Sequence, residues 1–194
     1  MTWFEPIRQS ADSRYGAVSV TLSLRPAQAA DIAAVGALHY DSRIAAYRDF
    51  VPIAGLRALS PESLTAWWRE RFTYEADTHW LTVAVDDGRT VGFSYVGPEE
   101  EHEADVGQLY AIHLDPTAQG RGIGRTLMVD ALETMSRKGW ARAVLWVLEG
   151  NAHARRFYER GGWRPDGRER EELMGAAPTR QLRYTKESWL GESA

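Results

Sequence analysis

Hydrophobic and polar positions follow two different periods along the chain, and segments of the two kinds alternate. Apolar residues recur every three or four positions, the spacing of a helix with one buried face, in residues 31–50, 60–72 and 122–137. Alternating or continuous apolar runs predict strands at residues 18–25, 80–85, 90–96, 109–114, 143–148, 163–168 and 181–186. We therefore predict an α/β (α+β) fold, a mixed sheet covered by helices, in a single domain over residues 20–188.

Turn and cap residues mark where several of these elements begin and end. Asp87 and Gly88 separate two strands, and an Asp-Gly pair in that place predicts a tight antiparallel hairpin. Asn151 predicts the cap of a short helix. The strand at 143–148 is apolar throughout, which is typical of a strand buried on both faces. Residues 175–179 are expected to form a loop between the last two strands.

Composition and charge limit the classes of function open to the chain. Its 194 residues carry 23 Lys and Arg against 27 Asp and Glu, a net charge of −4. This balance argues against a nucleic-acid partner, which needs clustered positive charge. The absence of cysteine excludes disulfides, thiolate metal sites and cysteine nucleophiles. We expect residues 1–19 to form a loosely ordered N-terminal extension. The lack of an apolar leader and of an apolar run long enough to span a membrane predicts a soluble, cytoplasmic protein.

A predicted strand leads through an Asp-Pro turn into a loop with three glycines, Gly120, Gly122 and Gly124. An amphipathic helix begins in this loop. The first N–H groups of a helix have no partner within it, and with the helix dipole they form an anion site of the kind that phosphates occupy. Glycines let a ligand approach the backbone, and Arg121 and Arg125 add positive charge. A loop that only needs positive φ at two positions explains the glycines equally well.

The residues around the glycines distinguish between phosphate loops. A Walker loop needs Gly-Lys-Ser/Thr, and a dinucleotide fingerprint read from Gly122 lacks its third glycine. The pattern Gln-x-x-Gly-x-Gly, from Gln119 to Gly124, resembles the acyl-CoA pyrophosphate loop of the GNAT superfamily of N-acetyltransferases. Downstream, "LEGNAHARRFYERGGW" is similar to that family's second CoA segment, in which an Asn opens a helix bearing Phe-Tyr. The resemblance covers roughly residues 18–186 and is strongest over 108–163.

This resemblance implies a fold and a set of ligand contacts. The fold would be a mostly antiparallel sheet of six to seven strands, with a bulge that splays one strand from the next at the acetyl-CoA cleft. Backbone groups of Ile112, His113 and Leu114 would hold the pantetheine arm. The pyrophosphate would bind the backbone amides of Gln119, Gly120, Arg121, Gly122, Ile123, Gly124 and Arg125. Asn151 would hydrogen-bond the cofactor, and Tyr158 would face the thioester sulfur.

The resemblance also implies the reaction, which is transfer of an acetyl group from acetyl-CoA to a primary amine by direct attack in a ternary complex. A lysine-like amine has a pKa near ~10.4, so about one molecule in ~10³ is neutral at pH 7. A base must take its proton, and Tyr158 would protonate the departing thiolate as general acid. Glu103 and Asp105, just before the strand that enters the cleft, are the candidate bases. Gln108 stands where many relatives carry an acid, which weakens the case for a simple carboxylate base.

Several of these assignments have a structural alternative. Asn151 can be an ordinary helix cap, Tyr158 a core residue and His113 a satisfied polar group. The five histidines lack metal-ligand spacing, so we predict no metal. Residues 39–68 are expected to line the acceptor pocket. The acidic run at 99–103 is either a solvated loop or a segment that attracts a cationic acceptor.

Two other functions stay open at the level of sequence. One is a non-catalytic acyl-CoA-binding or sensing protein on the same fold, and the other is a nucleotide-binding module. For the enzyme, the acceptor would be a small-molecule or peptide amine of unspecified identity. No nucleic-acid or membrane partner is expected, and family habit suggests a homodimer.

Overall fold

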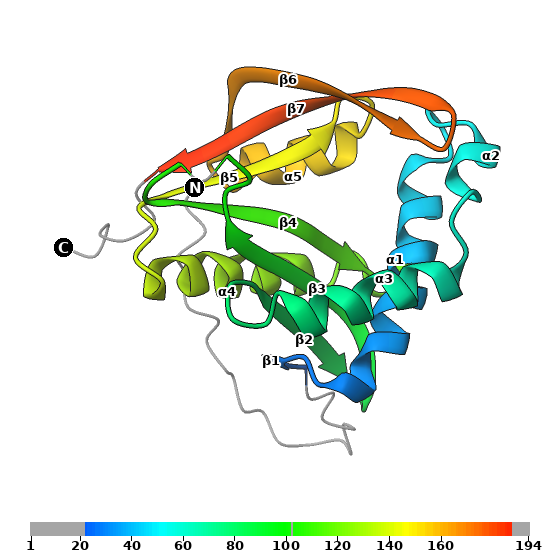
Figure 1. The fold of residues 1–194 in the computed structure, drawn as a ribbon, viewed down its shortest axis with the longest axis horizontal. Coiled ribbons are helices and arrows are strands. Elements are labelled where there is room, and N and C mark those ends of the chain that lie inside the picture. Colours follow the sequence, from blue (N-terminus) through cyan, green and yellow to red (C-terminus); the bar gives the residue numbers. More distant parts are fainter. Residues whose placement is uncertain (1–21, 102, 188–194) are drawn as a thin grey trace, which may run out of the picture.

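The computed structural model of the chain describes residues 22–101 and 103–187, which form one seven-stranded sheet with helices on both faces (Figure 1). The strands are β1 (Ser23–Pro26), β2 (Trp80–Asp86), β3 (Arg89–Pro98), β4 (Val106–Leu114), β5 (Arg142–Leu148), β6 (Arg164–Met174) and β7 (Ala177–Glu187). Their order is β1-β2-β3-β4-β5-β7-β6, and only β4 and β5 pair in parallel. The predicted mixed, mostly antiparallel α/β sheet is confirmed. The predicted extension at 1–19 and the first part of the strand at 18–25 lie outside the described residues.

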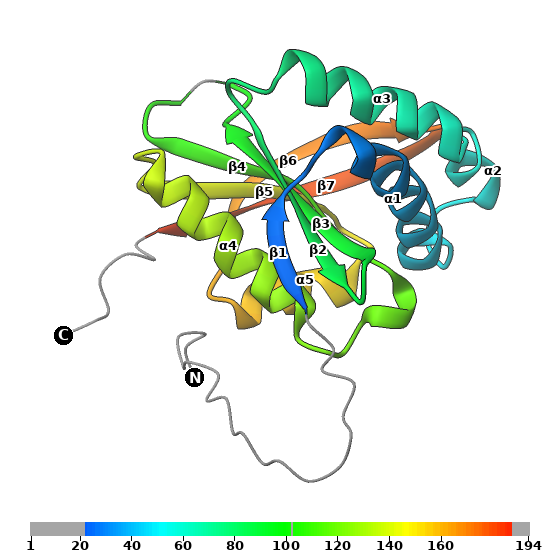
Figure 2. The ribbon, with the colours of Figure 1, turned by 90° about the horizontal axis from the view of Figure 1, so that it is seen from below.

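The helices form two layers, one on each face of the sheet (Figure 2). They are α1 (Ile32–Tyr47), α2 (Ile53–Leu56), α3 (Pro61–Tyr74), α4 (Ile123–Arg137) and α5 (Ala152–Arg160), with 3-10 turns η1 (Ala29–Asp31) and η2 (Pro116–Ala118). α1 and α3 cover one face, and α4 and α5 cover the other. Among the described residues, no helix has both the length and the apolar character needed to cross a membrane.

The predicted turn and cap residues take the conformations that their chemistry favours. Asp87 and Gly88 have positive φ values of 49° and 74°, as a two-residue hairpin turn between β2 and β3 requires. The side chain of Asn151 accepts a hydrogen bond from the Ala154 N–H at 3.1 Å and caps α5. Gly122 stands at the N-cap of α4 with a φ of 83°. The hairpin turn and the two helix starts were predictable because each depends on residues close in sequence.

β4 changes its surroundings halfway along its length. Residues 106–109 pair with β3 on one side and with β5 on the other. The pairing with β5 ends at Leu109 and Leu145, although both strands continue beyond these residues. At the same point the register with β3 shifts, which leaves Tyr110 as a bulge. Residues 110–114 therefore have a strand neighbour on one edge alone, and they are half-buried where 106–109 are buried.

The C-terminal hairpin is longer than its sequence pattern predicted. β6 and β7 have eleven residues each, and the loop expected at 175–179 is a turn at Gly175 and Ala176. β6 lacks an alternating pattern because it is an edge strand with nearly all of its side chains exposed. Ion pairs across the ladder, including that between Arg180 and Glu169, take the place of buried contacts.

The first long helix also differs from its prediction. α1 ends at Tyr47, short of the expected end near residue 50, and the short helix α2 was not expected. Asp31 does not cap α1 with its side chain. Its carboxylate pairs with Arg25 at 2.6 Å and accepts the Gln28 N–H, so it fixes the 3-10 turn that precedes the helix.

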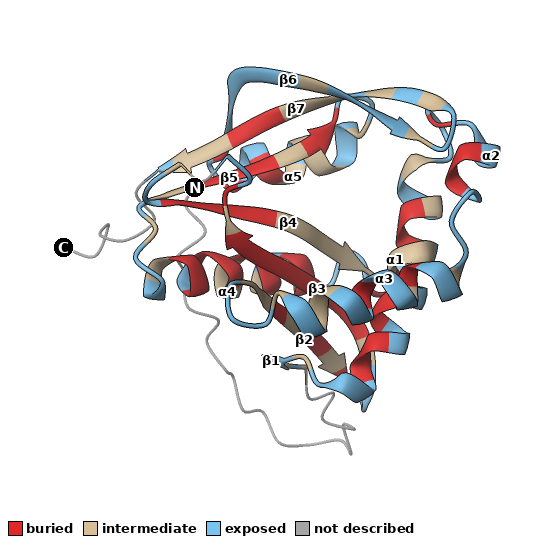
Figure 3. Cartoon of the chain, viewed as in Figure 1, coloured by how far each residue is buried: buried red, intermediate tan, exposed pale blue. Residues whose placement is uncertain are grey.

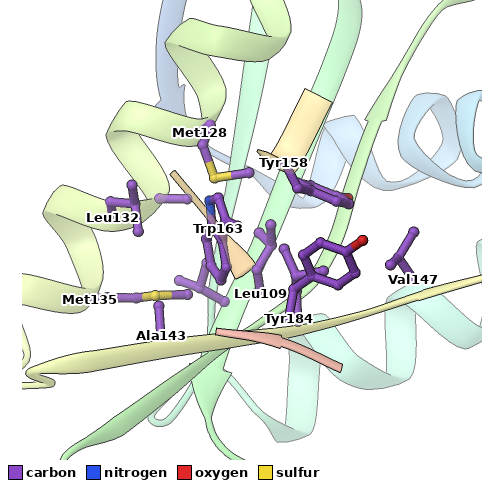
Figure 4. Close-up of a cluster of buried hydrophobic side chains, with 12 residues drawn as sticks. Leu109, Met128, Leu132, Met135, Ala143, Val147, Tyr158, Trp163 and Tyr184 are labelled. Carbon is purple, nitrogen blue, oxygen red and sulfur yellow. The ribbon is translucent and has the colours of Figure 1, made fainter. Parts of the chain in front are cut away.

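Buried residues in the described part of the chain, red in Figure 3, form three clusters, and the two larger ones hold the layers together on opposite faces of the sheet. One lies between the strands β4, β5 and β7 and the helices α4 and α5, and Figure 4 shows Tyr158, Trp163 and Tyr184 within it. The other lies between the strands β2 and β3 and the helices α1 and α3, and it contains Trp68 and Phe93. Each face of the sheet is therefore closed by its own pair of helices.

Gly36 permits the close crossing of α1 and α3, and we expect Gly36→Ala to destabilise the protein. A Cβ there would lie 2.7 Å from the Cα and 2.8 Å from the N of Thr65. Helix propensity alone would stabilise the variant by ~1 kcal/mol, but overpacking against backbone costs ~1–3 kcal/mol or more. Urea unfolding should show a net loss of about 1–2 kcal/mol. Ala45→Gly, at an exposed position of α1, is the control for propensity, and a Gly36→Ala protein as stable as the wild type would contradict this packing.

Candidate functional site

The three glycines at the start of α4, two in the preceding loop and Gly124 in the first turn of the helix, serve two different structural needs. Gly120 and Gly122 have φ values of 78° and 83°, and no heavy atom lies within 4 Å of the place that a Cβ would take. Gly124 is closely packed, since a Cβ there would lie 2.9 Å from a methyl group of Leu114 and 3.7 Å from the ring of Phe157. The loop therefore presents open backbone at the N-terminus of α4, where the first N–H groups have no partner within the helix.

Arg121, which was expected to add positive charge to this loop, forms an ion pair with Asp86 at 2.7 Å. Asp86 is the last residue of β2 and is buried. The guanidinium stays about half exposed, so the pair ties the loop to the β2–β3 hairpin and still leaves positive charge at the surface.

The half of β4 that β5 does not pair with runs directly into the glycine loop through η2. Ile112 and Leu114 pack on the face that α4 covers. His113 points to the opposite face, against His39 of α1. On the edge turned away from β3, these residues have no strand partner within the described sheet. Backbone groups on such an edge can hydrogen-bond an extended ligand.

Tyr158 lies on α5 in the larger core cluster, beside Trp163 and Tyr184 (Figure 4). Its side chain is buried, and burial raises the pKa of its phenol above the usual value. The neighbouring phenol of Tyr47 on α1 raises this pKa further. The hydroxyl of Tyr158 is therefore protonated across the neutral range, and it is a weaker acid than an ordinary phenol.

Asn151, at the start of the same helix, uses its side-chain oxygen for the cap of α5. Its NH₂ group is not needed for the cap, because an amide donates and accepts through different atoms. The structural and the ligand-binding roles predicted for Asn151 are therefore compatible.

Two histidines meet on the α1 side of β4. The ring centroids of His113 and His39 lie 4.5 Å apart. Ser42 Oγ lies 2.8 Å from Nδ1 of His113, and Trp68 donates its indole N–H to Nδ1 of His39 at 3.1 Å. Burial lowers the pKa of His39 to about 4 and that of His113 well below its usual value. Both imidazoles are therefore neutral at pH 7.

The polar residues that α1 brings to this place were not predicted from the sequence. They are Ser42 and Arg43, 5% and 7% exposed, together with His39. The prediction that residues 39–68 line the acceptor pocket named none of them. Their spacing could have predicted their burial, because they continue the helix face on which Val35 and the other buried apolar residues of α1 lie.

Glu103, a candidate general base, is held in an ion-pair cluster at the start of β4. Its carboxylate pairs with Arg142, with Arg183 at 3.2 Å and with Arg168 at 3.1 Å. The hydrogen bonds from Arg183 and Arg142 lower the pKa of Glu103 below its usual value. Such a carboxylate is a weak proton acceptor. The arrangement supports a structural role, and a catalytic one stays a prediction.

Asp105, the other candidate base, lies in the turn before β4 with a positive φ of 61°. Its carbonyl accepts the N–H groups of Ala141 and Arg142 and so sets the start of the parallel pairing with β5. From Val106 to Ile112 the strand rises about 20 Å at ~3.3 Å per residue. The structure therefore does not bring either candidate base next to the predicted pantetheine strand.

Gln108, where an acid was expected from the family pattern, is 2% exposed and hydrogen-bonded through both ends of its amide. Its amide donates to Glu100 at 2.9 Å and accepts the Glu100 N–H at 3.4 Å. The second oxygen of Glu100 pairs with Arg170 at 2.7 Å. Oxygens of Glu99, Glu101 and Glu103 lie within 4.8 Å of one another, and guanidinium groups already balance this acidic segment.

A shallow hollow of about 480 Å³ lies between α1 and the β2–β3 turn, lined by residues that include Asp41, Arg89 and Asp115. None of the predicted site residues lines this hollow. Its lining includes Asp115 and Pro116, so it borders the end of β4 without containing the predicted site residues.

Comparison with known proteins identifies the family of this chain. The model of the Acetyltransferase (GNAT) family matches residues 42–163. A Bacillus subtilis (strain 168) protein, "Uncharacterized N-acetyltransferase YuaI", is 31% identical over 132 residues, 67% of this chain and 73% of that protein. This chain belongs to the GNAT acetyltransferase family. The GNAT assignment makes it an acetyl-CoA-dependent N-acetyltransferase.

Further relatives of this GNAT enzyme share a shorter segment or the fold. The Mycothiol acetyltransferase of Beutenbergia cavernae is 43% identical over 86 residues, 44% of this chain and 28% of that protein. The structure of PaiA N-acetyltransferase from Thermoplasma acidophilum in complex with coenzyme A has a TM-score of 0.68 at 17% identity, covering 87% of this chain and 99% of that one. The yncA structure from Salmonella typhimurium with acetyl-CoA has a TM-score of 0.65 at 16% identity, covering 90% and 99%. At these identities the structures show a shared fold.

The neutral histidine pair makes the stability of the enzyme depend on pH. His39 has a pKa of about 4 in the folded chain against an ordinary value of 6.5, so the unfolded chain binds a proton first as the pH falls. Stability from this group is full above pH 6.5 and is lost as the pH falls towards 4, by roughly 2 kcal/mol between pH 7 and pH 5. His39→Gln, which keeps an acceptor for Trp68, should remove about that part of the pH dependence in urea unfolding. His153→Gln, at an exposed position, should keep it, and equal slopes in the two variants would contradict the assignment.

Proposed function

We propose that this GNAT enzyme acetylates a primary amine by direct attack of the amine on acetyl-CoA within a ternary complex. The observation that carries the proposal is the junction of the unpaired half of β4 with the open glycine loop at the start of α4. The strand edge suits an extended ligand with amide groups, and the helix start suits an anion. Acetyl-CoA has both features, a pantetheine arm and a pyrophosphate.

The binding residues follow from this junction. Backbone groups of Ile112, His113 and Leu114 would hold the pantetheine amides and the thioester carbonyl. The end of pairing between β4 and β5 would open the acetyl-CoA cleft. The NH₂ group of Asn151 would bind the cofactor near the arm. The pyrophosphate would lie against the backbone of Gln119, Gly120, Arg121, Gly122, Ile123, Gly124 and Arg125.

The chemistry needs a proton donor and a proton acceptor. The amine nitrogen forms a bond to the thioester carbon, the carbon–sulfur bond breaks, and the sulfur leaves with the electron pair. Tyr158 would give this thiolate its proton as general acid. Its phenol is protonated at neutral pH, and its raised pKa makes it a weaker acid than an ordinary tyrosine. The amine loses its own proton to a base. Glu103 and Asp105 precede β4 and lie too far away for direct transfer, so a chain of water molecules would have to carry the proton to either carboxylate.

Ligand binding tests the glycine loop. Acetyl-CoA should raise the melting temperature of the wild-type protein, whereas NAD and ATP, the ligands of the nucleotide-binding alternative, should not. Gly122→Ala should weaken acetyl-CoA binding by about tenfold or more, because its Cβ would enter the open face of the loop. Gly88→Ala is the matched control, since Gly88 also has a positive φ and an open Cβ position but lies in the β2–β3 turn. If both variants bind acetyl-CoA equally well, the loop is not the pyrophosphate site.

Turnover tests the role of Tyr158. Release of free CoA should be measured over a panel of polyamines, amino acids, aminoglycosides and peptides. Tyr158→Phe should lower kcat about 10²-fold or more and leave the Kd of acetyl-CoA almost unchanged, because the phenol acts on the leaving group. Tyr184→Phe is the control, a phenol of the same cluster that donates to Glu159.

Two results would count against this mechanism. Unchanged turnover of Tyr158→Phe with every amine would remove Tyr158 from the chemistry. Binding of acetyl-CoA without turnover of any amine would favour the acyl-CoA-sensing alternative over the transferase.

A further inference from the structure

Arg43 on α1 is a buried arginine without an acidic partner. It is 7% exposed, and one of its terminal nitrogens donates to the carbonyl of Leu56. Its Nε is fully buried and has no hydrogen-bond partner. Within residues 22–101 and 103–187, no carboxylate lies at ion-pairing distance from its guanidinium, whereas Arg183, also buried, pairs with Asp166 and two glutamates.

An unpaired buried charge is costly, because the guanidinium loses its hydration and gains no opposite charge in return. Burial lowers the pKa of Arg43 from its usual value, yet arginine stays protonated at neutral pH. A hydrogen bond to Leu56 could be made by a neutral side chain at lower cost. The retained charge therefore indicates a negative partner that is not part of the described chain.

The position of Arg43 on α1 indicates which ligand would carry this negatively charged group. Residues four apart lie on one face of a helix, so His39, Arg43 and Tyr47 form a single stripe. The ring of His39 lies against His113 of β4, and the phenol of Tyr47 helps to raise the pKa of Tyr158. Arg43 lies between His39 and Tyr47 along this stripe. The stripe therefore faces the region between the pantetheine strand and the proposed proton donor, which the acceptor must enter.

The charges around this region also favour an anionic ligand. The acidic run at 99–103 was the sequence feature that suggested a cationic acceptor. In the structure, Glu100 pairs with Arg170 and Glu103 with three arginines, so these carboxylates are already neutralised. Arg43 has no such compensation, and its charge contributes to the low pKa of both His39 and His113.

We infer that Arg43 binds a carboxylate of the acceptor, so that the substrate is an amino acid or a similar amine with an anionic group. Arginine suits this role because its planar fork can give two parallel hydrogen bonds to a carboxylate. The inference rests on the proposed function and specifies its substrate class. It disfavours polyamines and aminoglycosides, which would add positive charge beside an uncompensated guanidinium.

Matched acceptor pairs test the inference with the wild-type enzyme. Each of the α-amino acids is compared with the amine that lacks only its carboxyl group, with acetyl-CoA saturating and free CoA as the readout. At least one amino acid should exceed its partner by about tenfold or more in kcat/KM, the effect of one charge-assisted hydrogen bond. Equal rates in every pair, preference for the amines, or no acetylation of any amino acid would overturn the inference.

The acceptors that are acetylated distinguish a wrong proposed function from a wrong carboxylate site. If the transferase proposal is wrong, no amine is acetylated, with or without a carboxylate. If only the carboxylate site is wrong, amines without a carboxylate are acetylated as well as or better than the amino acids.

Variants of Arg43 give the second test. Arg43→Met should raise the KM of the amino acid about 10- to 100-fold and leave the KM of acetyl-CoA and the kinetics of the matched amine nearly unchanged. Arg43→Lys keeps the charge and should recover part of the loss. Arg48→Met is the control, an exposed arginine at the end of the same helix. Equal losses for the acid and the amine would assign Arg43 a structural role. If neither Arg43 variant folds, the acceptor pairs with the wild-type enzyme decide.

Discussion

The break in strand pairing at Leu109 is the constraint on which the candidate site depends. Up to this residue, β4 is a central strand with a neighbour on each side, and beyond it one edge has no strand partner in the described sheet. Tyr110 bulges out of the register with β3 at the same point. β5 keeps its place in the sheet because it pairs with β7 on its other side along its full length. The sheet therefore exposes a backbone edge in its interior without losing its hydrogen-bonded frame.

The two halves of β4 differ in their strand pairing and in the segments that they contact. The first half is paired on both sides, and its surroundings contain an ion-pair cluster in which Arg183 joins β7 to the β3–β4 loop. The second half leads to the glycine loop, where Gly124 lets α4 pack closely on Leu114. The first half of β4, which is paired on both sides, fixes the direction of the second half. The unpaired edge of β4 and the glycine loop therefore keep one orientation relative to each other.

Charged residues also differ in whether they have a partner of opposite charge. Carboxylates that looked available in the sequence are tied to guanidinium groups, as Glu103 and Glu100 show. Arg43, which the sequence did not single out, has no such partner and lies on the helix that faces His113. The unpaired charge on α1 is therefore positive, opposite in sign to the acidic run at 99–103.

Local features were predictable from the sequence because they depend on neighbours a few residues away. The Asp87-Gly88 turn, the Asn151 cap and the start of α4 at Gly122 are of this kind. The family followed from the same local motifs. The boundaries of β6 were not predictable, because an exposed edge strand is held by cross-strand pairing rather than by an apolar pattern.

Tertiary structure alone decided which side chains meet. Ser42 and His113 are 71 residues apart in sequence and 2.8 Å apart in space, and Glu103 and Arg183 are separated by 80 residues. Such contacts follow from how helices and strands pack, since burial and charge pairing depend on segments that the chain brings together only on folding. The sequence by itself therefore determined the fold and the cofactor motifs, and the packing of α1 and β4 decided the character of the acceptor region.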